Sequence, residues 1–176
     1  PYLEHGMLPD NAVLIGGPPC QAYSVVGRAR NKGEEGYVAE KDQRHFLYRE
    51  YLHVIAEFRP AVFVMENVKG ILSSKVGDGH IFHRILDDLK NPGLADGSRD
   101  SLEYVLTPLV DPESRTEPAP EDFIIKAENF GIPQARHRVI ILGIRKDVYE
   151  RLQGFHGLEA SPRLTVRQAL GDLPSL

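Results

Sequence analysis

The chain has 176 residues, of which 41% are hydrophobic and 26% charged, and its net charge at pH 7 is −4. This balance predicts one soluble globular domain with a buried core. No apolar run approaches the ~20 residues of a membrane helix, and the amino end lacks a signal-peptide pattern. We therefore expect a protein of the cytoplasm, nucleoid or nucleus, neither secreted nor in a membrane. The single cysteine excludes an internal disulfide. Because the net charge is negative, any binding of nucleic acid would have to depend on local clusters of basic residues.

The first predicted element is a short strand over residues 12–15, which two glycines and two prolines at positions 16–19 bring to an end. The first side chain beyond that turn is Cys20. A thiol at the carboxyl end of a strand stands where open α/β sheets place their chemistry. Residues 22–41 then predict a long functional loop, because they are rich in glycine and charge. Its clustered basic residues are Arg28, Arg30 and Lys32.

Alternation of helices and strands continues beyond this loop. Apolar residues at helical spacing predict a helix over residues 47–58 and another over residues 81–89. Between them, residues 61–65 form a continuous apolar run, which is typical of a strand buried on both faces. That strand ends in Glu66-Asn67. This order of elements predicts a parallel α/β sheet.

The last third of the chain predicts strands over residues 102–110, 123–127 and 138–144, of which the last two should pair antiparallel. Residues 111–121 are rich in proline and acid and predict an exposed insertion. One short helix is expected over residues 165–170.

Three stretches stand at strand ends and carry side chains for one reaction. They are Pro18-Pro19-Cys20-Gln21, Glu66-Asn67-Val68 and Gln134-Ala135-Arg136-His137-Arg138. Carboxyl ends of parallel strands meet at one edge of a sheet. We therefore expect a thiol, a carboxyl group and a guanidinium group to lie together there.

In this order, the three stretches resemble the motifs of the DNA (cytosine-5) methyltransferase family. The first motif continues as Gln21-Ala22-Tyr23-Ser24, and Asp42-x-Arg44-x-x-Leu47 resembles the family's next element. The resemblance runs from about Asn11 to Pro174. It implies a Rossmann-like, S-adenosylmethionine-dependent methyltransferase sheet, mostly parallel with an antiparallel last strand and incomplete at both ends.

The same resemblance implies that residues 1–176 form a single partial catalytic domain. Its nucleophile loop would be residues 16–43, the insertion residues 111–121, and the approach to a missing target-recognition region residues 161–176. The family's Phe-x-Gly-x-Gly cofactor loop has no counterpart in the chain, and Lys126 stands where the family often has Asn. We therefore expect this chain by itself to bind the cofactor weakly and to be inactive.

The resemblance assigns catalytic roles to Cys20, Glu66, Arg136 and Arg138. The Cys20 thiolate would attack carbon 6 of cytosine, because only this attack makes carbon 5 nucleophilic. Glu66 would donate a proton at ring N3, a role that calls for a buried carboxyl group. Arg138 would hold the base's O2, and Arg136 would support Glu66 or the loop.

The cofactor implied is S-adenosylmethionine, with Pro19 and Leu47 as contacts, and the partner is double-stranded DNA with a flipped cytosine. No metal site is expected, because the seven histidines lack ligand spacing. No oligomer is predicted, and restriction–modification, epigenetic marking and phage biology stay open as settings. The residues expected to contact DNA are Gln21, Ser24, Arg28, Arg30, Lys32, Asn67 and Gln134.

Three other functions remain open from the sequence. An RNA cytosine-5 methyltransferase would carry the same motifs. A methyltransferase-like module that binds nucleic acid without catalysis fits the absent cofactor loop. A cysteine hydrolase would need an imidazole, from His45 or His137, within hydrogen-bond reach of Cys20.

Overall fold

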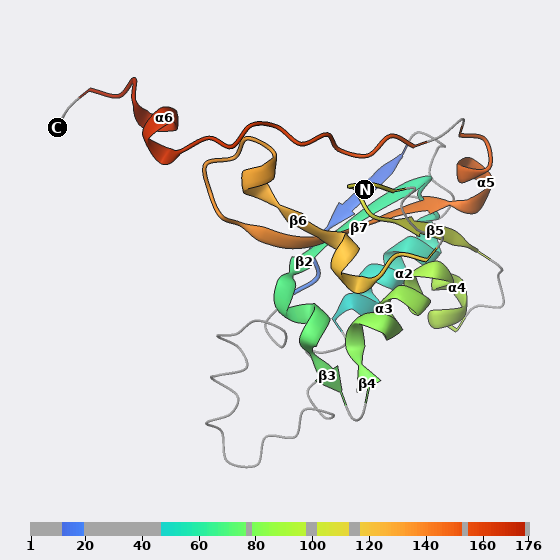
Figure 1. Cartoon of the computed structure of the whole chain (residues 1–176). Coiled ribbons are helices and arrows are strands. Elements are labelled where there is room, and N and C mark those ends of the chain that lie inside the picture. The colour runs from blue at the N-terminus through green and yellow to red at the C-terminus, as the bar shows by residue number, and fades with distance from the viewer. Residues whose placement is uncertain are drawn as a thin grey trace, which may run out of the picture.

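The computed structural model describes residues 12–19, 47–76, 79–97, 102–112, 117–152 and 155–174. A five-stranded mixed sheet lies at its centre, with the two longest helices and one short helix gathered on one side (Figure 1). The strands are β1 (Val13–Gly16), β2 (Val62–Val68), β5 (Tyr104–Thr107), β6 (Ile124–Lys126) and β7 (His137–Arg145). The helical and minor elements are α2 (Tyr48–Phe58), η3 (Lys69–Ser73), β3 (Lys75–Val76), β4 (Gly79–His80), α3 (Ile81–Lys90), α4 (Pro92–Ala95), η4 (Pro120–Phe123), η5 (Ala127–Asn129), α5 (Lys146–Tyr149) and α6 (Val166–Leu170).

The strand order is β1-β2-β7-β5, and β6 also pairs with β7. β1 is parallel to β2, whereas β7 is antiparallel to β2, β5 and β6. Strands β1, β2, β5 and β6 therefore run in one direction and β7 runs in the opposite direction, which confirms the predicted sheet of mostly parallel strands with an antiparallel last strand. The antiparallel pairing of β6 with β7 is confirmed as well.

The predicted boundaries shift where prolines and caps intervene. The strand expected over residues 102–110 ends at Thr107, because Pro108 has no N–H for the ladder. Helix α2 ends at Phe58, as predicted, because its C-cap Arg59 adopts a left-handed φ of 46° and its N–H donates to the Ile55 carbonyl at 2.9 Å. The short tail helix is confirmed, and Thr165 and Gln168 form its capping box.

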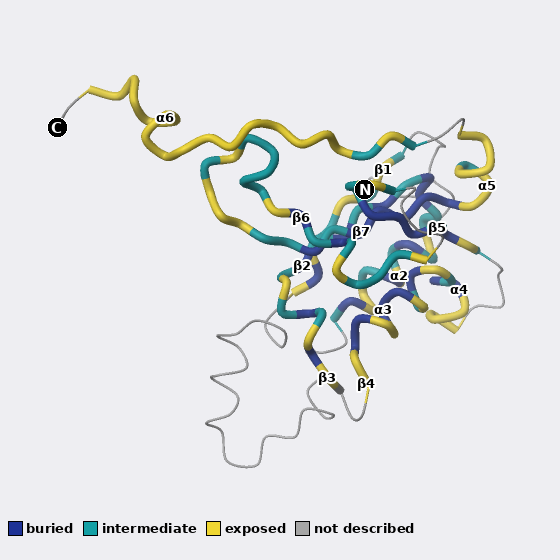
Figure 2. Tube along the Cα trace, viewed as in Figure 1, coloured by how far each residue is buried: buried dark blue, intermediate teal, exposed yellow. Residues whose placement is uncertain are grey.

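The core lies between the sheet and helices α2 and α3 (Figure 2). Phe63 and Met65 on β2 point into it and are at most 1% exposed. The expectation that this strand is buried on both faces is wrong, since its alternate residues are only half-buried. On that second face, Val13 and Ile15 of β1 are 55% and 75% exposed, because the described helices cover the other face.

Replacing Gly143 by alanine should destabilise the fold by about 1–3 kcal/mol, through overpacking of the core. Gly143 lies opposite Phe63 in the register of β2 and β7, and a Cβ at this position would overlap the Phe63 ring. Gly79→Ala is the matched control, because nothing lies within 4 Å of a Cβ there. Urea unfolding measures both variants, and an unchanged midpoint for Gly143→Ala would contradict the packing argument.

An exposed ion pair ties α2 to the turn after α4. Nδ1 of His53 lies 3.1 Å from Oδ2 of Asp96. The hydrogen bond to this carboxylate raises the pKa of His53 above its ordinary value. The stabilisation by the pair is therefore fully present below about pH 6.5 and is lost as the pH rises through the raised value.

Within the described ranges, every helix is too short or too polar to cross a bilayer.

Candidate functional site

The site can be built from the ends of β1, β2 and β7. Cys20 lies outside the described residues, as do five of the expected DNA contacts. These five are Gln21, Ser24, Arg28, Arg30 and Lys32. The site geometry therefore rests on the turn before Cys20, the end of β2 and the start of β7.

Glu66 and Arg138 form an ion pair between adjacent strands. Nε of Arg138 lies 2.7 Å from Oε1 of Glu66. The two residues share a face, because Val68 lies opposite Arg138 in the antiparallel register and Glu66 is two residues before Val68. A second Arg138 nitrogen, Nη1, donates to the His137 carbonyl at 2.8 Å and orients the guanidinium group. Two of the three predicted stretches thus meet.

The Glu66 carboxyl group is open to solvent. Its side chain is 41% exposed and that of Arg138 is 26% exposed. The sequence-based expectation of a buried carboxyl group is therefore wrong, because Glu66 projects from the less covered face of β2. The carboxyl group of Glu66 and the guanidinium group of Arg138 therefore lie side by side and partly open at this edge of the sheet.

The turn after β1 packs against the end of β2. A Cβ on Gly17 would lie only 3.2 Å from Oε2 of Glu66, so the backbone of this turn runs beside the carboxyl group. Nδ2 of Asn67 donates to the Pro18 carbonyl at 3.2 Å, and Asn67 is 2% exposed. The first stretch is therefore tied to the second at Pro18, two residues before Cys20.

Asn67 has a different task from the DNA contact expected from the sequence. Its side chain is buried and bridges two backbone groups, since Oδ1 also accepts from the Val68 N–H at 2.9 Å. A buried amide in that position fixes the turn and does not reach a phosphate. The alternation of side chains along a strand could have predicted the burial of Asn67, because Asn67 points to the same face of β2 as the buried Phe63 and Met65.

Gln134 and Arg136 are exposed on the loop that leads into β7. Backbone hydrogen bonds shape this loop: the Arg136 N–H donates to the Gln134 carbonyl at 2.8 Å, and the Ala127 N–H donates to the Arg136 carbonyl at 3.0 Å. Among the described residues, Arg138 and not Arg136 contacts Glu66. Gln134 and Arg136 are open to an outside partner.

Tyr51 is a site residue that sequence reasoning treated only as part of a helix face. Its hydroxyl donates to the carbonyls of Val64 at 3.0 Å and Leu14 at 3.4 Å, on neighbouring strands. The ring packs on Gly16, where a Cβ would displace it. Burial raises the pKa of Tyr51, so the phenol remains a neutral donor. Tyr51 thereby anchors α2 to β1 and β2 near their ends. Leu47, which directly precedes α2, is held in place with the helix.

The histidine required by a hydrolase is engaged elsewhere in the described part of the chain. Nε2 of His137 lies 2.8 Å from Oε1 of Glu128. His45 lies outside the described residues. The residues that the structure describes also contain no group of three potential metal ligands.

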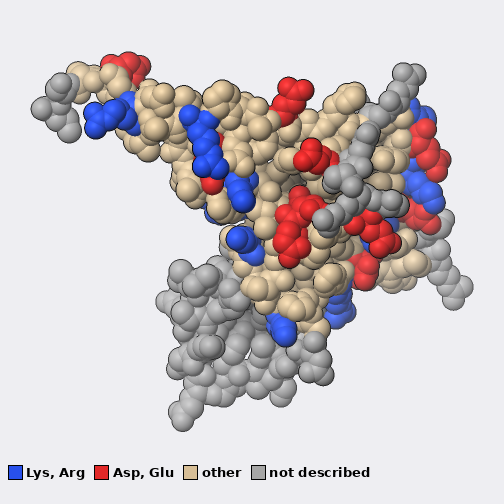
Figure 3. Space-filling model, viewed as in Figure 1, with Lys and Arg blue, Asp and Glu red and all other residues tan. Residues whose placement is uncertain are grey.

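On the face seen in Figure 3, most acidic side chains lie over the body of the molecule together with some basic ones, and a further group of basic side chains lies toward the carboxyl-terminal tail. Four exposed basic residues belong to the tail and the β6–β7 region: Lys126, Arg136, Arg163 and Arg167. Of these four, Lys126 lies opposite His137 in the register of β6 and β7, next to the strand position of Arg138.

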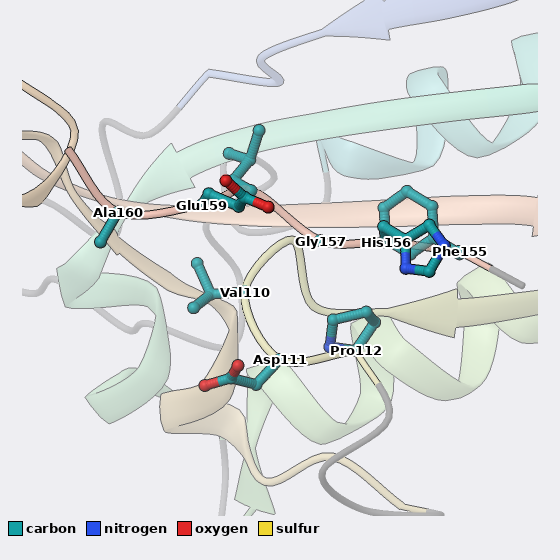
Figure 4. Close-up of a pocket in the computed structure, with 9 residues that line it drawn as sticks. Val110, Asp111, Pro112, Phe155, His156, Gly157, Glu159 and Ala160 are labelled. Carbon is teal, nitrogen blue, oxygen red and sulfur yellow. The ribbon is translucent and has the colours of Figure 1, made fainter.

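A cleft of ≈ 610 Å³ lies apart from this site. Residues 155–160 of the tail pass over the Val110–Pro112 turn and enclose it (Figure 4). Its lining includes Asp111, His156 and Glu159 but none of the expected site residues. The Leu158 N–H donates to the Leu109 carbonyl at 2.6 Å, which closes one end of the crossing.

Comparisons with known proteins point in one direction. Residues 3–95 and 121–175 match a family model described as C-5 cytosine-specific DNA methylase. The match leaves out residues 96–120, which include most of the proline-rich and acidic insertion.

The curated relatives are longer than this chain. The Type II methyltransferase M.Bpa9945I of Bacillus paralicheniformis is 37% identical over 99% of this chain and 35% of its own length. M.BspRI of Lysinibacillus sphaericus is 31% identical over 94% of this chain and 32% of its own length. A crystal structure described as a prophage-encoded DNA modification methyltransferase (E. coli) matches with a TM-score of 0.55 and 25% identity, over 93% of this chain and 35% of that one. The chain spans about a third of the length of these proteins.

Proposed function

The chain belongs to the C-5 cytosine-specific DNA methylase family, and we propose that the full-length protein transfers a methyl group from S-adenosylmethionine to carbon 5 of cytosine in DNA. The observation that carries the proposal is the Glu66–Arg138 ion pair beside the turn that precedes Cys20. A carboxyl and a guanidinium group side by side can bind the N3 edge and O2 of one cytosine ring. The names of the relatives, Type II methyltransferases, support the same reaction and a role in restriction–modification.

In the proposed mechanism, the Cys20 thiolate forms a bond to carbon 6 and the ring's 5,6 double bond opens toward carbon 5. Glu66 donates a proton at N3, so that the ring accepts the electron pair, while Arg138 holds O2. S-adenosylmethionine, when bound, supplies an electrophilic methyl group. After methylation a base removes the carbon 5 proton, the 5,6 double bond re-forms and the thiolate of Cys20 leaves, while N3 returns its proton to Glu66.

The described residues fit S-adenosylmethionine in part. Pro19 is exposed beside the end of β1, and Leu47 is half-buried at the start of α2. Tyr51 fixes these two elements to each other, so the pair can form one apolar wall for the cofactor. Residues outside this chain would supply the remaining contacts in the full-length protein.

The proposed substrate is a cytosine turned out of the duplex. A stacked base cannot approach a carboxyl group held at a sheet edge, and flipping costs a few kcal/mol. The exposure of Glu66, Gln134 and Arg136 leaves this edge open to such a base and to the strand around it. The loop that follows Cys20, with its basic cluster, would close over the base and contact phosphates.

Incubation of the full-length protein with tritiated S-adenosylmethionine and either duplex DNA or RNA of the same sequence tests the function. We expect label in DNA, at carbon 5 of cytosine on nucleoside analysis. Label in RNA alone would replace the proposal by an RNA methyltransferase. Binding of DNA without any label would make the protein a module that binds without catalysis.

A further inference from the structure

A hydrogen bond between two side chains lies at the base of the loop that carries the exposed residues of the site. Glu128 belongs to η5, which follows β6, and His137 is the first residue of β7. Their side chains meet at 2.8 Å, between Oε1 and Nε2. The loop of residues 130–136 leaves η5 and returns to β7, so the pair joins its two ends.

Backbone contacts close the same base. The Ala127 N–H donates to the Arg136 carbonyl at 3.0 Å, and the register places Lys126 opposite His137. The Ile132 N–H also returns to the Ala127 carbonyl, at 3.3 Å. The loop is therefore held at both ends, and the Glu128–His137 contact is the side-chain part of that closure.

The tail adds a brace on the other side of η5. Nη2 of Arg163 donates to Oδ1 of Asn129 at 2.7 Å, and the Ser161 N–H donates to the Asn129 carbonyl at 2.9 Å. A bridge between Phe130 and Ser161 continues this contact. Glu128 thus sits in a segment fixed by the tail and holds β7 on its opposite side.

The environment of Glu128 makes His137 its main partner. Oε2 of Glu128 is buried and, among the described residues, has no hydrogen-bond partner. The hydrogen bond from His137 lowers the pKa of Glu128, and the nearby charge of Arg163 acts in the same direction. The carboxylate is therefore ionised at neutral pH, and its hydrogen bond to the imidazole is charge-assisted.

We propose that Glu128 is a positioning residue, which through His137 fixes the loop of residues 130–136 and so presents Gln134 and Arg136 to the DNA strand. The inference rests on the proposed function for its substrate. It concerns substrate binding and not the chemical step, because Glu128 is not among the groups that contact Glu66 or Arg138. A fixed loop binds a strand more tightly than a mobile one, since its ordering entropy is already lost before binding.

Steady-state methyl transfer by full-length variants tests the inference. Glu128→Ala should raise the KM for DNA about fivefold to tenfold, the effect of one charge-assisted hydrogen bond, and leave kcat within about twofold. Glu128→Gln keeps an oxygen that accepts from His137 and should restore most of the loss. The matched control is Asp96→Ala, which breaks the His53 pair far along the chain from the loop and should leave KM unchanged.

Hydrogen exchange gives a readout that needs no activity. The Glu128→Ala variant should exchange faster over residues 130–136 than the native protein, and Asp96→Ala should not. If Glu128→Ala had the KM for DNA of the native protein and also its hydrogen-exchange rates over residues 130–136, the inference would be overturned. A full-length native protein that methylates nothing would overturn the proposed function alone, and the exchange measurement would then decide the positioning role. If Glu128→Ala fails to fold, His137→Ala carries the same comparison, because alanine removes the partner of Glu128.

Discussion

Replacing Cys20 by alanine should reduce methyl transfer by a factor of at least about 10⁴, as expected when a covalent nucleophile is lost. Carbon 5 of cytosine has little nucleophilicity until a thiolate has added at carbon 6. The alanine side chain cannot form that bond, whereas the turn before it, tied to Asn67, remains in place. Affinity for DNA should stay within about twofold, because phosphate contacts supply most of it.

Single-turnover methylation with the variant in excess over DNA measures the first quantity, and fluorescence anisotropy of the same duplex measures the second. The control is Arg28→Ala, which should weaken binding across all sequences and flatten its salt dependence. Turnover by Cys20→Ala near the native rate would refute the assignment of the nucleophile. Lost binding in that variant would show that Cys20 shapes the DNA surface.

Much of the sheet edge was predictable, because the carboxyl ends of parallel strands meet at the same edge of a sheet. Apolar runs ending at positions 15 and 65 indicated two parallel strands whose carboxyl ends meet, and the register confirms this with Gly16 opposite Met65. Glu66 follows at once, so its place at the edge needed no side-chain information. The antiparallel last strand then brought Arg138 to the same place.

The choice between the two arginines was beyond the sequence. Arg136 and Arg138 share the same parity, so strand alternation cannot separate them. The start of β7 at His137 decides the matter, since Arg136 still belongs to the loop. Strand ends vary by one or two residues for reasons that lie in distant pairing partners, here β2 and β6.

Other parts of the site left no periodic signal. Glu128 lies in a short 3-10 turn, where neither helical nor strand spacing applies, and its partner is set by the return of the chain into β7. The sequence also could not show which face of β2 is covered by helices, because a continuous apolar run is the same on both faces of the strand. Asn67 lies on the buried face of β2, and there its side chain donates a hydrogen bond to the Pro18 carbonyl.

The Glu66–Arg138 pair predicts the second large effect. Glu66→Gln should lower kcat for methyl transfer by about 10²–10⁴, the range for loss of a positioned proton donor. The amide keeps an oxygen that accepts from Nε of Arg138, which now lies 2.7 Å from Oε1, so the local geometry should persist. KM for DNA should change little, because the lost proton transfer belongs to the reaction and not to binding.

Single-turnover rates of Glu66→Gln, Arg138→Ala and the double variant separate the two residues. If both side chains act on the same ring, the double variant should be far less impaired than the product of the single losses, because removing either one already disables the shared step. Independent losses that multiply would mean that the two groups act at different stages. Native kcat in Glu66→Gln would exclude proton donation and leave the ion pair with a structural role at the junction of β2 and β7.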